Sequence, residues 1–296
     1  NPAVTCPDQA RTIAGLSRED LFTVVHDTYL TDTARYADIV LPACTAFETE
    51  DIYRGYGTYY VQHGPRVIPP QGESASNLWV VQELAHRLGL TDPVFTRSTR
   101  EHLAALLAGA RGPTTAVTLD RLLTGEPIKL PYPQTGPERT FFASPAMAAD
   151  GLPSLPEWQP DQAEPALDSP WPLRLLTAPG HHQSHTTFSF VERSRVLDGE
   201  PRCLLHPDEA SRRGLEDGVA VAVANERGFV GLRLRVTTDT RPGIVVVEGQ
   251  KNRSTYLGGG SINVLTSDTL SDMGGGATYQ STWVDVRRLD ESPVPV

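Results

Sequence analysis

The run Gly258-Gly259-Gly260-Ser261-Ile262-Asn263-Val264-Leu265-Thr266, followed by Asp272 and Gly274-Gly275-Gly276, is the stretch from which the fold can be worked out. Six glycines within nineteen residues cannot build a core, but they allow positive φ and close approach of the main chain to a ligand. Asn263 offers a donor and an acceptor, and an ionised Asp272 only accepts, which suits a base edge or a ribose hydroxyl. The alternative is an ordinary surface loop.

Short β segments dominate the chain around this run, from residue 173 onward. Turn signals such as Asp217-Gly218 and Arg241-Pro242-Gly243 separate them. One small helix is expected at His206-Pro207-Asp208-Glu209-Ala210, with proline in its first turn and acidic side chains that favour the helix dipole. Six strands with few helices predict a closed barrel, because closure removes exposed edges. The expected strands are residues 173–177, 202–205, 219–225, 229–236, 244–248 and 282–287.

The first part of the chain has an α/β pattern. An apolar strand is predicted within residues 21–30, a short helical turn over residues 31–37, and a second strand over residues 38–42 that Pro42 ends. Such strands favour a parallel sheet covered on both faces. Ligands of parallel sheets lie beyond the carboxyl ends of the strands, where Asp27 falls.

Two helices are expected after this sheet. The first covers residues 74–90, with Ser74 or Ser76 as its cap and Gly89 as its end, and the second covers about residues 99–107. Their predicted core faces are Leu78, Val81, Leu84, Ala85 and Leu88 on the first helix and Leu103, Leu106 and Leu107 on the second.

A proline-rich stretch separates the two parts. Residues 127–172 hold 11 of the chain's 25 prolines, and proline fixes φ and removes a backbone donor, so an extended surface connection is expected. The predicted organisation is an α/β domain over residues 1–125, a linker over residues 126–172 and an all-β domain over residues 173–296.

The totals limit the class of protein and its partners. The chain has 296 residues, 39% hydrophobic and 21% charged, which is typical of a globular protein with two domains. No apolar run approaches the ~18 residues of a membrane span, and no signal peptide is visible, so a cytoplasmic location is expected. The net charge of −10 argues against nucleic acid as a partner. Because the first residue is Asn1, a fragment or processed chain is expected.

Metal-binding patterns are weak. Cys6, Cys44 and Cys203 form no metal-ligand spacing, so reduced structural thiols and no iron–sulfur cluster are expected in this chain. The densest polar cluster is His181-His182-Gln183-Ser184-His185. A zinc site is not favoured there, because no Glu lies within a helical turn of the histidines and no Cys is near. The cluster is either a solvated loop or an anion site, where His, Ser and main-chain amides hold phosphate beyond a strand.

Patterns of a hydrolase are weak too. No Gly-x-Ser-x-Gly motif supports a nucleophilic serine. Glu48, Glu50 and Asp51 could form an acid–base or metal site, but charge clusters in loops are usually solvated, so that interpretation is preferred.

A family resemblance connects these features. Thr31-x-Thr33-Ala34-x-x-Ala37-Asp38-Ile39-Val40-Leu41-Pro42 resembles the hallmark stretch of the molybdopterin-dinucleotide oxidoreductases, the dimethyl sulfoxide reductase family. Further motifs follow in order over nearly the whole chain. They are Glu48-x-x-Asp51-Ile52, Gly64-Pro65-x-Val67-Ile68-x-Pro70-x-Gly72-Glu73, Ala85-x-x-Leu88-Gly89, the helix start at His206 through Gly214, Asp217-Gly218, Asn225-x-Arg227-Gly228, Arg241-Pro242-Gly243 and Asn263-x-Leu265-Thr266.

The resemblance implies a partial Rossmann-like α/β domain followed by a six-stranded double-psi β-barrel. In the family, these domains hold the guanosine and pyrophosphate ends of a bis-molybdopterin guanine dinucleotide cofactor with molybdenum or tungsten. The residues implied along the pterin and phosphates are Thr177, Gly180, His181, His182, Ser184, His185 and Thr187. Asn263, Asp272, Tyr279 and Gln280 are implied near the nucleotide or pterin, and Asp27 near a guanine.

The chain departs from the family in length. Family enzymes are far longer, and their other part holds the Ser, Cys or selenocysteine that ligates the metal and, where present, an iron–sulfur cluster. No catalytic or metal-ligating residue is therefore expected here. The resemblance implies a cofactor-holding C-terminal portion that is inactive alone, whose partners are the N-terminal domains of the same protein and an electron-transfer protein. The alternatives are a non-catalytic dinucleotide-binding accessory subunit and a zinc hydrolase built on the histidine cluster.

Overall fold

The computed structural model describes residues 1–131, 142–155, 157, 165–166, 168–271 and 274–291. The chain divides into two compact units. The first comprises Asn1–Val25, Leu30–Ile39 and Gln159–Val296, and the second His26–Tyr29 and Val40–Trp158. The N-terminal segment thus groups with the barrel. The division predicted at residues 125 and 172 concerns which parts fold independently, and it stays a prediction.

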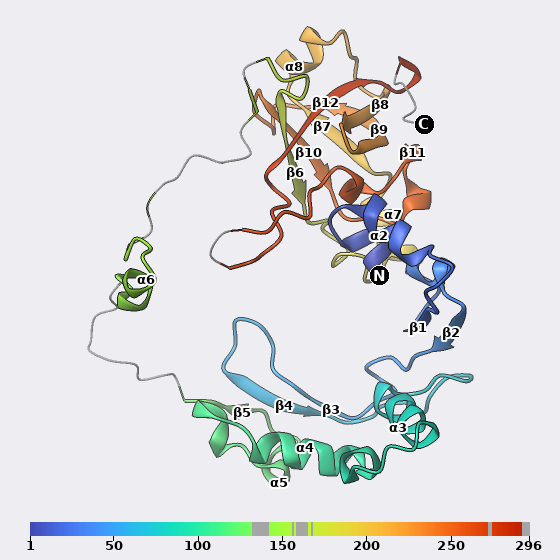
Figure 1. The fold of residues 1–296 in the computed structure, drawn as a ribbon, viewed down its shortest axis with the longest axis vertical. Coiled ribbons are helices and arrows are strands. Elements are labelled where there is room, and N and C mark those ends of the chain that lie inside the picture. Colours follow the sequence, from blue (N-terminus) through green and yellow to red (C-terminus); the bar gives the residue numbers. More distant parts are fainter. Residues whose placement is uncertain (132–141, 156, 158–164, 167, 272–273, 292–296) are drawn as a thin grey trace. The chain divides into compact units, whose positions relative to one another are not determined.

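Six strands of the first unit close into a barrel (Figure 1). They are β6 (Leu173–Ala178), β7 (Arg202–Leu205), β8 (Ala220–Asn225), β9 (Gly228–Val236), β10 (Ile244–Glu248) and β12 (Thr282–Arg288). The order around the barrel is β9-β7-β10-β6-β12-β8, and β8 pairs back with β9. The pairs β10–β6 and β7–β9 are parallel, and the other pairs are antiparallel. The six strands, the closure of the sheet and its mixture of parallel and antiparallel pairs confirm the predicted barrel. Every predicted strand end lies within one residue of the observed strand end.

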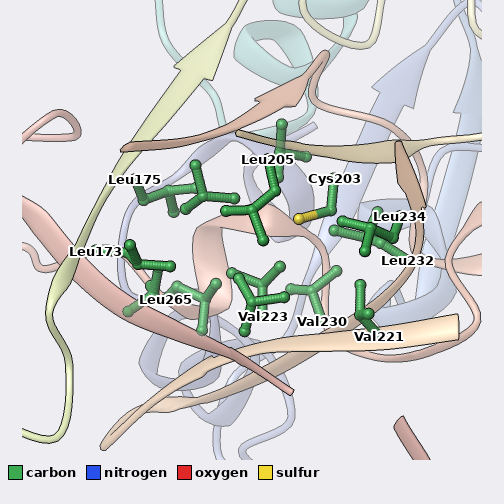
Figure 2. Close-up of a cluster of buried hydrophobic side chains, with 14 of the residues drawn as sticks. Leu173, Leu175, Cys203, Leu205, Val221, Val223, Val230, Leu232, Leu234 and Leu265 are labelled. Carbon is green, nitrogen blue, oxygen red and sulfur yellow. The ribbon is translucent and has the colours of Figure 1, made fainter. Parts of the chain in front are cut away.

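The barrel core follows from a two-residue periodicity. Successive side chains of a strand point to opposite faces, so alternate apolar residues share the interior. Figure 2 shows these side chains meeting inside the barrel. The buried pairs are Leu173 and Leu175, Cys203 and Leu205, Val221 and Val223, Val245 and Val247, and Val284 and Val286. Burial raises the pKa of the Cys203 thiol to about 12, which fits the predicted structural role of this cysteine.

Short helices and turns connect these strands. They are α7 (Glu192–Asp198), α8 (Pro207–Arg212), η4 (Arg253–Thr255) and η5 (Ile262–Val264), and a further turn, η6 (Leu289–Glu291), follows β12. The helix expected at His206 is α8, in which His206 is the N-cap and Pro207 lies in the first turn. Within the glycine run, Gly258–Gly259 forms β11, which pairs with β9.

The N-terminal segment of the first unit contains α1 (Pro2–Thr5), α2 (Gln9–Leu16) and the 3-10 turn η1 (Thr33–Tyr36). This turn confirms the helical turn predicted over residues 31–37. The strands β1 (Val24–Asp27) and β2 (Ile39–Pro42) flank this turn in the sequence and pair with each other, and the division between the two units runs through both strands. Hydrogen bonds from Asp38 N to Thr23 O and from Ala43 N to Asp27 O advance along both strands together, as in a parallel pair.

The second unit combines a three-stranded antiparallel sheet with helices. The strands are β3 (Asp51–Tyr53), β4 (Tyr60–Gly64) and β5 (Ile128–Lys129). The helical elements are α3 (Asn77–Arg87), η2 (Pro93–Thr96), α4 (Thr99–Ala108), η3 (Gly112–Ala116), α5 (Leu119–Leu122) and α6 (Pro145–Ala149). Ser76 caps α3 as predicted. A small core gathers Val61, Val117, Leu122, Ile128 and Leu130.

The predicted core faces of the helices are only partly correct. On α3 Ala85 is buried, whereas Val81, Leu84 and Leu88 are exposed, and on α4 Leu103 is buried and Leu106 exposed. The expected cover on both faces of the β1–β2 sheet is also wrong, because Val24, Ile39 and Val40 are exposed. Amphipathic periodicity identifies which side of a helix or strand is apolar. Among the described residues of this chain, no other element packs against these apolar sides.

Candidate cofactor site

The end of β6 is joined directly to the residues before β12. The backbone N of Thr177 donates to Gln280 Oε1 at 3.3 Å, and Gln280 Nε2 donates to Thr177 Oγ1 at 3.3 Å. Two residues predicted for the cofactor, 103 positions apart, are therefore neighbours. The loop of residues 179–191, named here the β6 loop, begins at this point.

A buried ion pair lies against the first part of the β6 loop. The backbone N of His182 donates to Asp198 Oδ1 at 3.1 Å, and Lys251 Nζ lies 3.8 Å from Asp198 Oδ2. The side chains of Lys251 and Asp198 are 8% and 6% exposed. Burial lowers the pKa of Lys251, and the neighbouring carboxylates of Asp198 and Glu248 oppose that shift. Lys251 Nζ also donates to Gly199 O at 2.9 Å, at the end of α7, where a cation is favourable.

Gly180 lets the end of β6 lie close to the end of β10. A Cβ on Gly180 would be 3.4 Å from Asp198 Oδ2 and 3.6 Å from Gly249 Cα. Gly249 N donates to Ala178 O at 2.8 Å, which extends the pairing of the two strands. Gly180 thus lies directly beside the buried carboxylate.

The outer part of the β6 loop exposes its polar side chains. Ser184, His185 and Thr187 are exposed, and a hydrogen bond from Thr187 N to Ser184 O at 2.9 Å closes a tight turn. His185 has a φ of +52°, which is uncommon outside glycine, and its Nδ1 lies 3.3 Å from Gln250 Oε1. His181 is exposed, with its ring edge-on to that of His182 at 4.6 Å between centroids.

Asn263 and Tyr279 converge on one backbone carbonyl. Asn263 Nδ2 donates to Thr5 O at 3.1 Å and to Val4 O at 2.8 Å, and Tyr279 Oη donates to Thr5 O at 3.0 Å. Burial raises the pKa of Tyr279, which keeps this hydroxyl a donor. Asn263 is fully buried, and its Oδ1 has no hydrogen-bond partner among the described residues. Its amide oxygen is therefore the group left to accept a further hydrogen bond.

The first glycines of the run are required by packing inside the protein. A Cβ on Gly259, which has a φ of +76°, would lie 2.0 Å from Phe229 O. A Cβ on Gly260 would lie 2.5 Å from Gln9 Oε1. The close approach expected toward a ligand is thus, at these two positions, an approach to β9 and to α2. Asp272 lies outside the described residues.

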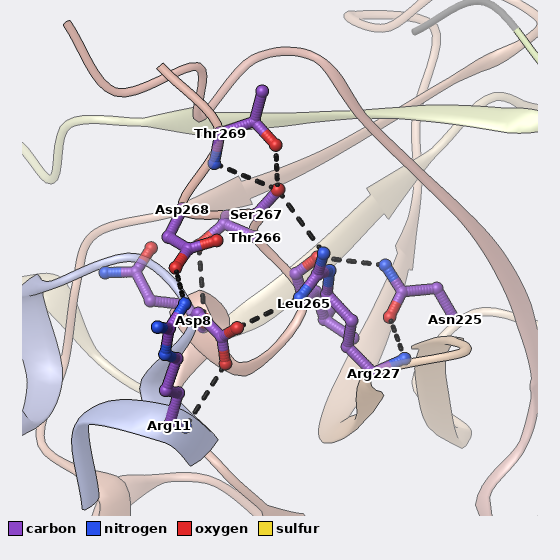
Figure 3. A network of polar contacts seen from close by, with 10 residues as sticks. Asp8, Arg11, Asn225, Arg227, Leu265, Thr266, Ser267, Asp268 and Thr269 are labelled. Carbon is purple, nitrogen blue, oxygen red and sulfur yellow. Dashed lines mark hydrogen bonds and ion pairs between the residues drawn. The ribbon is translucent and has the colours of Figure 1, made fainter. Parts of the chain in front are cut away.

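A polar network ties the segment after Asn263 to α2 (Figure 3). Arg227 donates to Asp8 Oδ2 at 3.1 Å and to Ser267 Oγ at 3.3 Å, and Arg11 pairs with Asp268 at 2.6 Å. Asp8 N donates to Thr266 O at 3.0 Å. The N-terminal helices therefore position the loop that carries Asn263.

Two residues singled out in the sequence, Asp27 and Glu48, belong to the second unit. Asp27 is partly buried at the end of β1, and its Oδ1 accepts from Thr28 N at 2.7 Å. Glu48 is buried, so the solvated interpretation of the acidic cluster is wrong at this residue. Thr45 N donates to it at 2.5 Å and Gln71 N at 2.6 Å, and these donors hold the pKa of Glu48 at about 2. The carboxylate thus organises loops.

A cavity of about 1080 Å³ lies at the β6 loop, and its lining includes Gly180, His181, His182, Asp198, Arg202 and Lys251. The cavity unites three predicted residues. Thr177, Ser184, His185, Thr187, Asn263, Tyr279 and Gln280 are not among its lining residues. Among the described residues, no group of three or more His, Cys, Asp or Glu side chains could hold a metal ion. No helix in the described part is long and apolar enough to cross a membrane.

Sequence reasoning missed Asp198 and Lys251. Asp198-Gly199 reads as an ordinary helix end followed by a turn. Lys251 had a usable signal, because the chain has only two lysines, Lys129 and Lys251, and Lys251 follows a predicted strand closely.

Comparisons with known proteins agree with this arrangement. Residues 173–283 match the family model of the molydopterin dinucleotide binding domain, and residues 1–87 match that of the molybdopterin oxidoreductases. "Probable oxidoreductase YoaE" of Bacillus subtilis is 36% identical over 98% of this chain and 43% of its own length. The dimethyl sulfoxide reductase DmsA of Escherichia coli is 28% identical over 90% of this chain and 38% of its own length.

A solved structure shows the same fold. Acetylene hydratase from Pelobacter acetylenicus aligns with 97% of this chain and 43% of its own length, with a TM-score of 0.74 and 21% identity. The chain spans less than half the length of these relatives. The closed barrel, the two family models and the relatives together place the chain in the molybdopterin-dinucleotide oxidoreductase family of the dimethyl sulfoxide reductase type.

Proposed function

We propose that this chain is the cofactor-holding portion of an oxidoreductase that uses bis-molybdopterin guanine dinucleotide with molybdenum or tungsten. The observation that carries the proposal is the cavity at the β6 loop, within the barrel that matches a molydopterin dinucleotide binding domain. The overall field of an acidic chain repels an anionic dinucleotide, so hydrogen-bond donors for it must be concentrated locally. The donors of the barrel can meet this need.

The residues present fit such a group. Exposed Ser184, His185 and Thr187 offer donors to phosphate, and the buried Oδ1 of Asn263 lacks a hydrogen-bond partner in the described part of the chain. The other proposed contacts of the barrel with the cofactor come from Thr177, Gly180, His181, His182, Asp272, Tyr279 and Gln280. Asp27 is proposed to contact a guanine. When bound, the metal dithiolene supplies the two-electron redox chemistry. The protein residues bind and orient the cofactor.

The catalytic metal ligand is proposed to lie in another part of the protein, so this chain alone is inactive. Its partners are then the other domains of the protein and an electron-transfer protein, and the cytoplasmic location stays a prediction. A non-catalytic accessory subunit is the less favoured function, because residues 1–87 match the family model of the oxidoreductases in addition to the binding domain.

Cofactor analysis of the purified protein tests the proposal. Acid treatment should release an oxidised pterin and GMP, and elemental analysis should find molybdenum or tungsten. Release of CMP would overturn the guanine form. Protein without any pterin, from cells that make the cofactor, would overturn the proposed function. Stoichiometric zinc would restore the hydrolase alternative.

A further inference from the structure

The β6 loop is held in an unfavourable backbone conformation. Among the described residues other than glycine, only Asp8, His185 and Phe188 have a positive φ, and two of these three lie in the β6 loop, at +52° and +68°. A residue with a side chain disfavours this left-handed region, so the conformation persists only where surrounding contacts impose it. The loop therefore depends on contacts from another segment.

Two residues just after β10 contact the outer and the last part of the β6 loop. Gln250 Oε1 lies 3.3 Å from His185 Nδ1, at the first left-handed position. Asn252 Nδ2 donates to Ser189 Oγ at 3.4 Å, and Ser189 directly follows Phe188, the second left-handed position. Ser189 is buried, so the loop is fixed there. Both left-handed positions thus lie at or beside a contact with this segment.

Lys251, between these two residues, acts on the first part of the loop through Asp198. Lys251 Nζ lies 3.8 Å from Asp198 Oδ2, and Asp198 Oδ1 accepts from the backbone N of His182 at 3.1 Å. Lys251 is itself buried, and its backbone N donates to Tyr256 Oη at 3.3 Å. Three consecutive residues therefore hold three separate parts of the β6 loop.

The next residue, Arg253, fixes this segment to the N-terminal turn η1. Its backbone N donates to Asp32 Oδ2 at 3.1 Å, and its Nη1 donates to Tyr36 Oη at 2.8 Å. Asp32 is buried and is the N-cap residue of η1. Among the described residues, Asp32 has no hydrogen bond or ion pair with the β6 loop itself. It reaches the loop only through residues 250–253, named here the 250–253 segment.

We propose that Asp32 is a positioning residue for the cofactor. Through Arg253 it fixes the 250–253 segment, and this segment holds the β6 loop in one conformation before the cofactor binds. The proposal rests on the proposed function, because the first residues of the β6 loop line the cavity assigned to the cofactor. A loop that is already ordered loses less conformational freedom on binding, so the ligand is held more tightly. Loss of Asp32 should therefore loosen the loop and weaken binding without removing a ligand contact.

Hydrogen exchange of the cofactor-free chain, followed by mass spectrometry, tests the first step. The full chain is produced in cells unable to make the pterin cofactor. The amides to follow are those of His182, Thr187, Ser189 and Val191, which are hydrogen-bonded in the β6 loop. Asp32→Ala removes the acceptor of Arg253 N, so peptides covering residues 179–191 should exchange about tenfold faster than in wild type. Asp32→Asn keeps an amide oxygen as acceptor and should restore most of the protection.

Two controls show whether the effect is local. Peptides covering β8, in the barrel core, should exchange as in wild type in every variant. Arg35→Ala removes only the exposed cation that lies 3.6 Å from the other oxygen of Asp32, and it should leave the loop unchanged. An equal acceleration in β8 and in the β6 loop would mean that Asp32 supports the whole unit, which would overturn the specific role.

Gln250→Ala is a second variant, independent of the buried carboxylate. It removes the contact with His185 and leaves Asp32 and Arg253 in place. The β6 loop should again exchange faster than in wild type, with β8 unchanged. This variant decides the role of the 250–253 segment even if Asp32→Ala does not fold.

Pterin retention tests the second step. Holoprotein is prepared from cells that make the cofactor, and the loss of pterin during dialysis is followed by fluorescence after oxidation. The rate of loss should be about tenfold higher for Asp32→Ala than for wild type, with Asp32→Asn and Arg35→Ala close to wild type.

The remaining outcomes separate the claims. Unchanged exchange of the β6 loop in both Asp32→Ala and Gln250→Ala would overturn the positioning role and leave the proposed function standing. A loosened loop with an unchanged rate of pterin loss would make the segment a structural support only, which also overturns the role. Wild-type protein that carries no pterin would overturn the proposed function and this role with it.

Discussion

Gln9 and Ser261 hold each other through both polar ends of the glutamine amide, although 252 positions separate them. Gln9 Nε2 donates to Ser261 Oγ at 2.6 Å, and Ser261 N donates to Gln9 Oε1 at 2.8 Å. The same Nε2 donates to Ala3 O at 2.6 Å, and both residues are buried. Because Gln9 is the first residue of α2 and Ser261 directly precedes η5, the pair fixes the N-terminal helices to the loop that carries Asn263.

Replacing Gln9 with leucine should lower the free energy of unfolding by about 2–4 kcal/mol, because several buried polar groups of Ala3 and Ser261 lose their partner. Urea denaturation measures the change. Arg11→Ala on the same helix is the control, since its ion pair with Asp268 is exposed and should contribute less than about 1 kcal/mol. Equal losses in the two variants would show that the buried pair adds nothing beyond general anchoring of α2.

Gly259→Ala should destabilise the protein more than Gly275→Ala. Both glycines have positive φ, +76° and +58°, so alanine is strained by about 1 kcal/mol or more at either position. Only at Gly259 would the Cβ also meet Phe229 O at 2.0 Å, whereas nothing lies within 4 Å at Gly275. Thermal unfolding of the two variants isolates the steric contribution. Similar melting temperatures would mean that β11 moves freely away from β9.

The contribution of Glu48 to the stability of the folded state should depend on pH. Its pKa of about 2 lies below the ordinary value of 4.5, chiefly because Thr45 N donates to the carboxylate. A carboxyl whose pKa is lowered by folding stabilises the folded state above its unfolded pKa, and loses this effect as pH falls toward the folded pKa. The difference in melting temperature between wild type and Glu48→Gln should therefore be full above pH 4.5 and shrink toward pH 2. A constant difference over this range would contradict the assignment.

His185→Ala and Asn263→Ala should each weaken cofactor retention about ten- to a hundredfold, as expected for a lost hydrogen bond to a charged ligand. Cofactor content per polypeptide after purification is the measurement. Asn263→Ala also frees the carbonyls of Val4 and Thr5, so its cofactor content is compared at equal folded fraction. His86→Ala, at an exposed position in the last turn of α3, is the control for His185. Full cofactor in both variants with unchanged stability would exclude these loops from the dinucleotide site.

Limited proteolysis should cut first within about residues 145–170, because this proline-rich stretch is expected to cross the surface with few core contacts. Within this stretch the structure describes α6, a short helix that contributes no buried residue, where the sequence predicts an extended connection. Mass spectrometry of the early fragments locates the cuts. First cleavage elsewhere, with this stretch protected, would overturn the predicted linker.

The sequence by itself determined the barrel and the family. Strand periodicity, proline and glycine turn signals and helix caps act between residues a few positions apart, so local patterns give the six strands of the barrel, the N-cap of α3 and the start of α8. The ordered motifs from Thr31 to Thr266 identified the cofactor class because each motif is contiguous.

Only the tertiary structure decided how side chains distant in the chain meet. The pairing of Gln9 with Ser261, the ion pair of Asp198 with Lys251 and the convergence of Asn263 and Tyr279 on Thr5 O each join separate segments. No local periodicity encodes such contacts, because they depend on how the barrel closes and where α1 and α2 pack. For the same reason Val81 and Leu88 have the spacing of core residues and yet are exposed: a pattern marks the apolar side of a helix, and the packed elements decide whether it is covered.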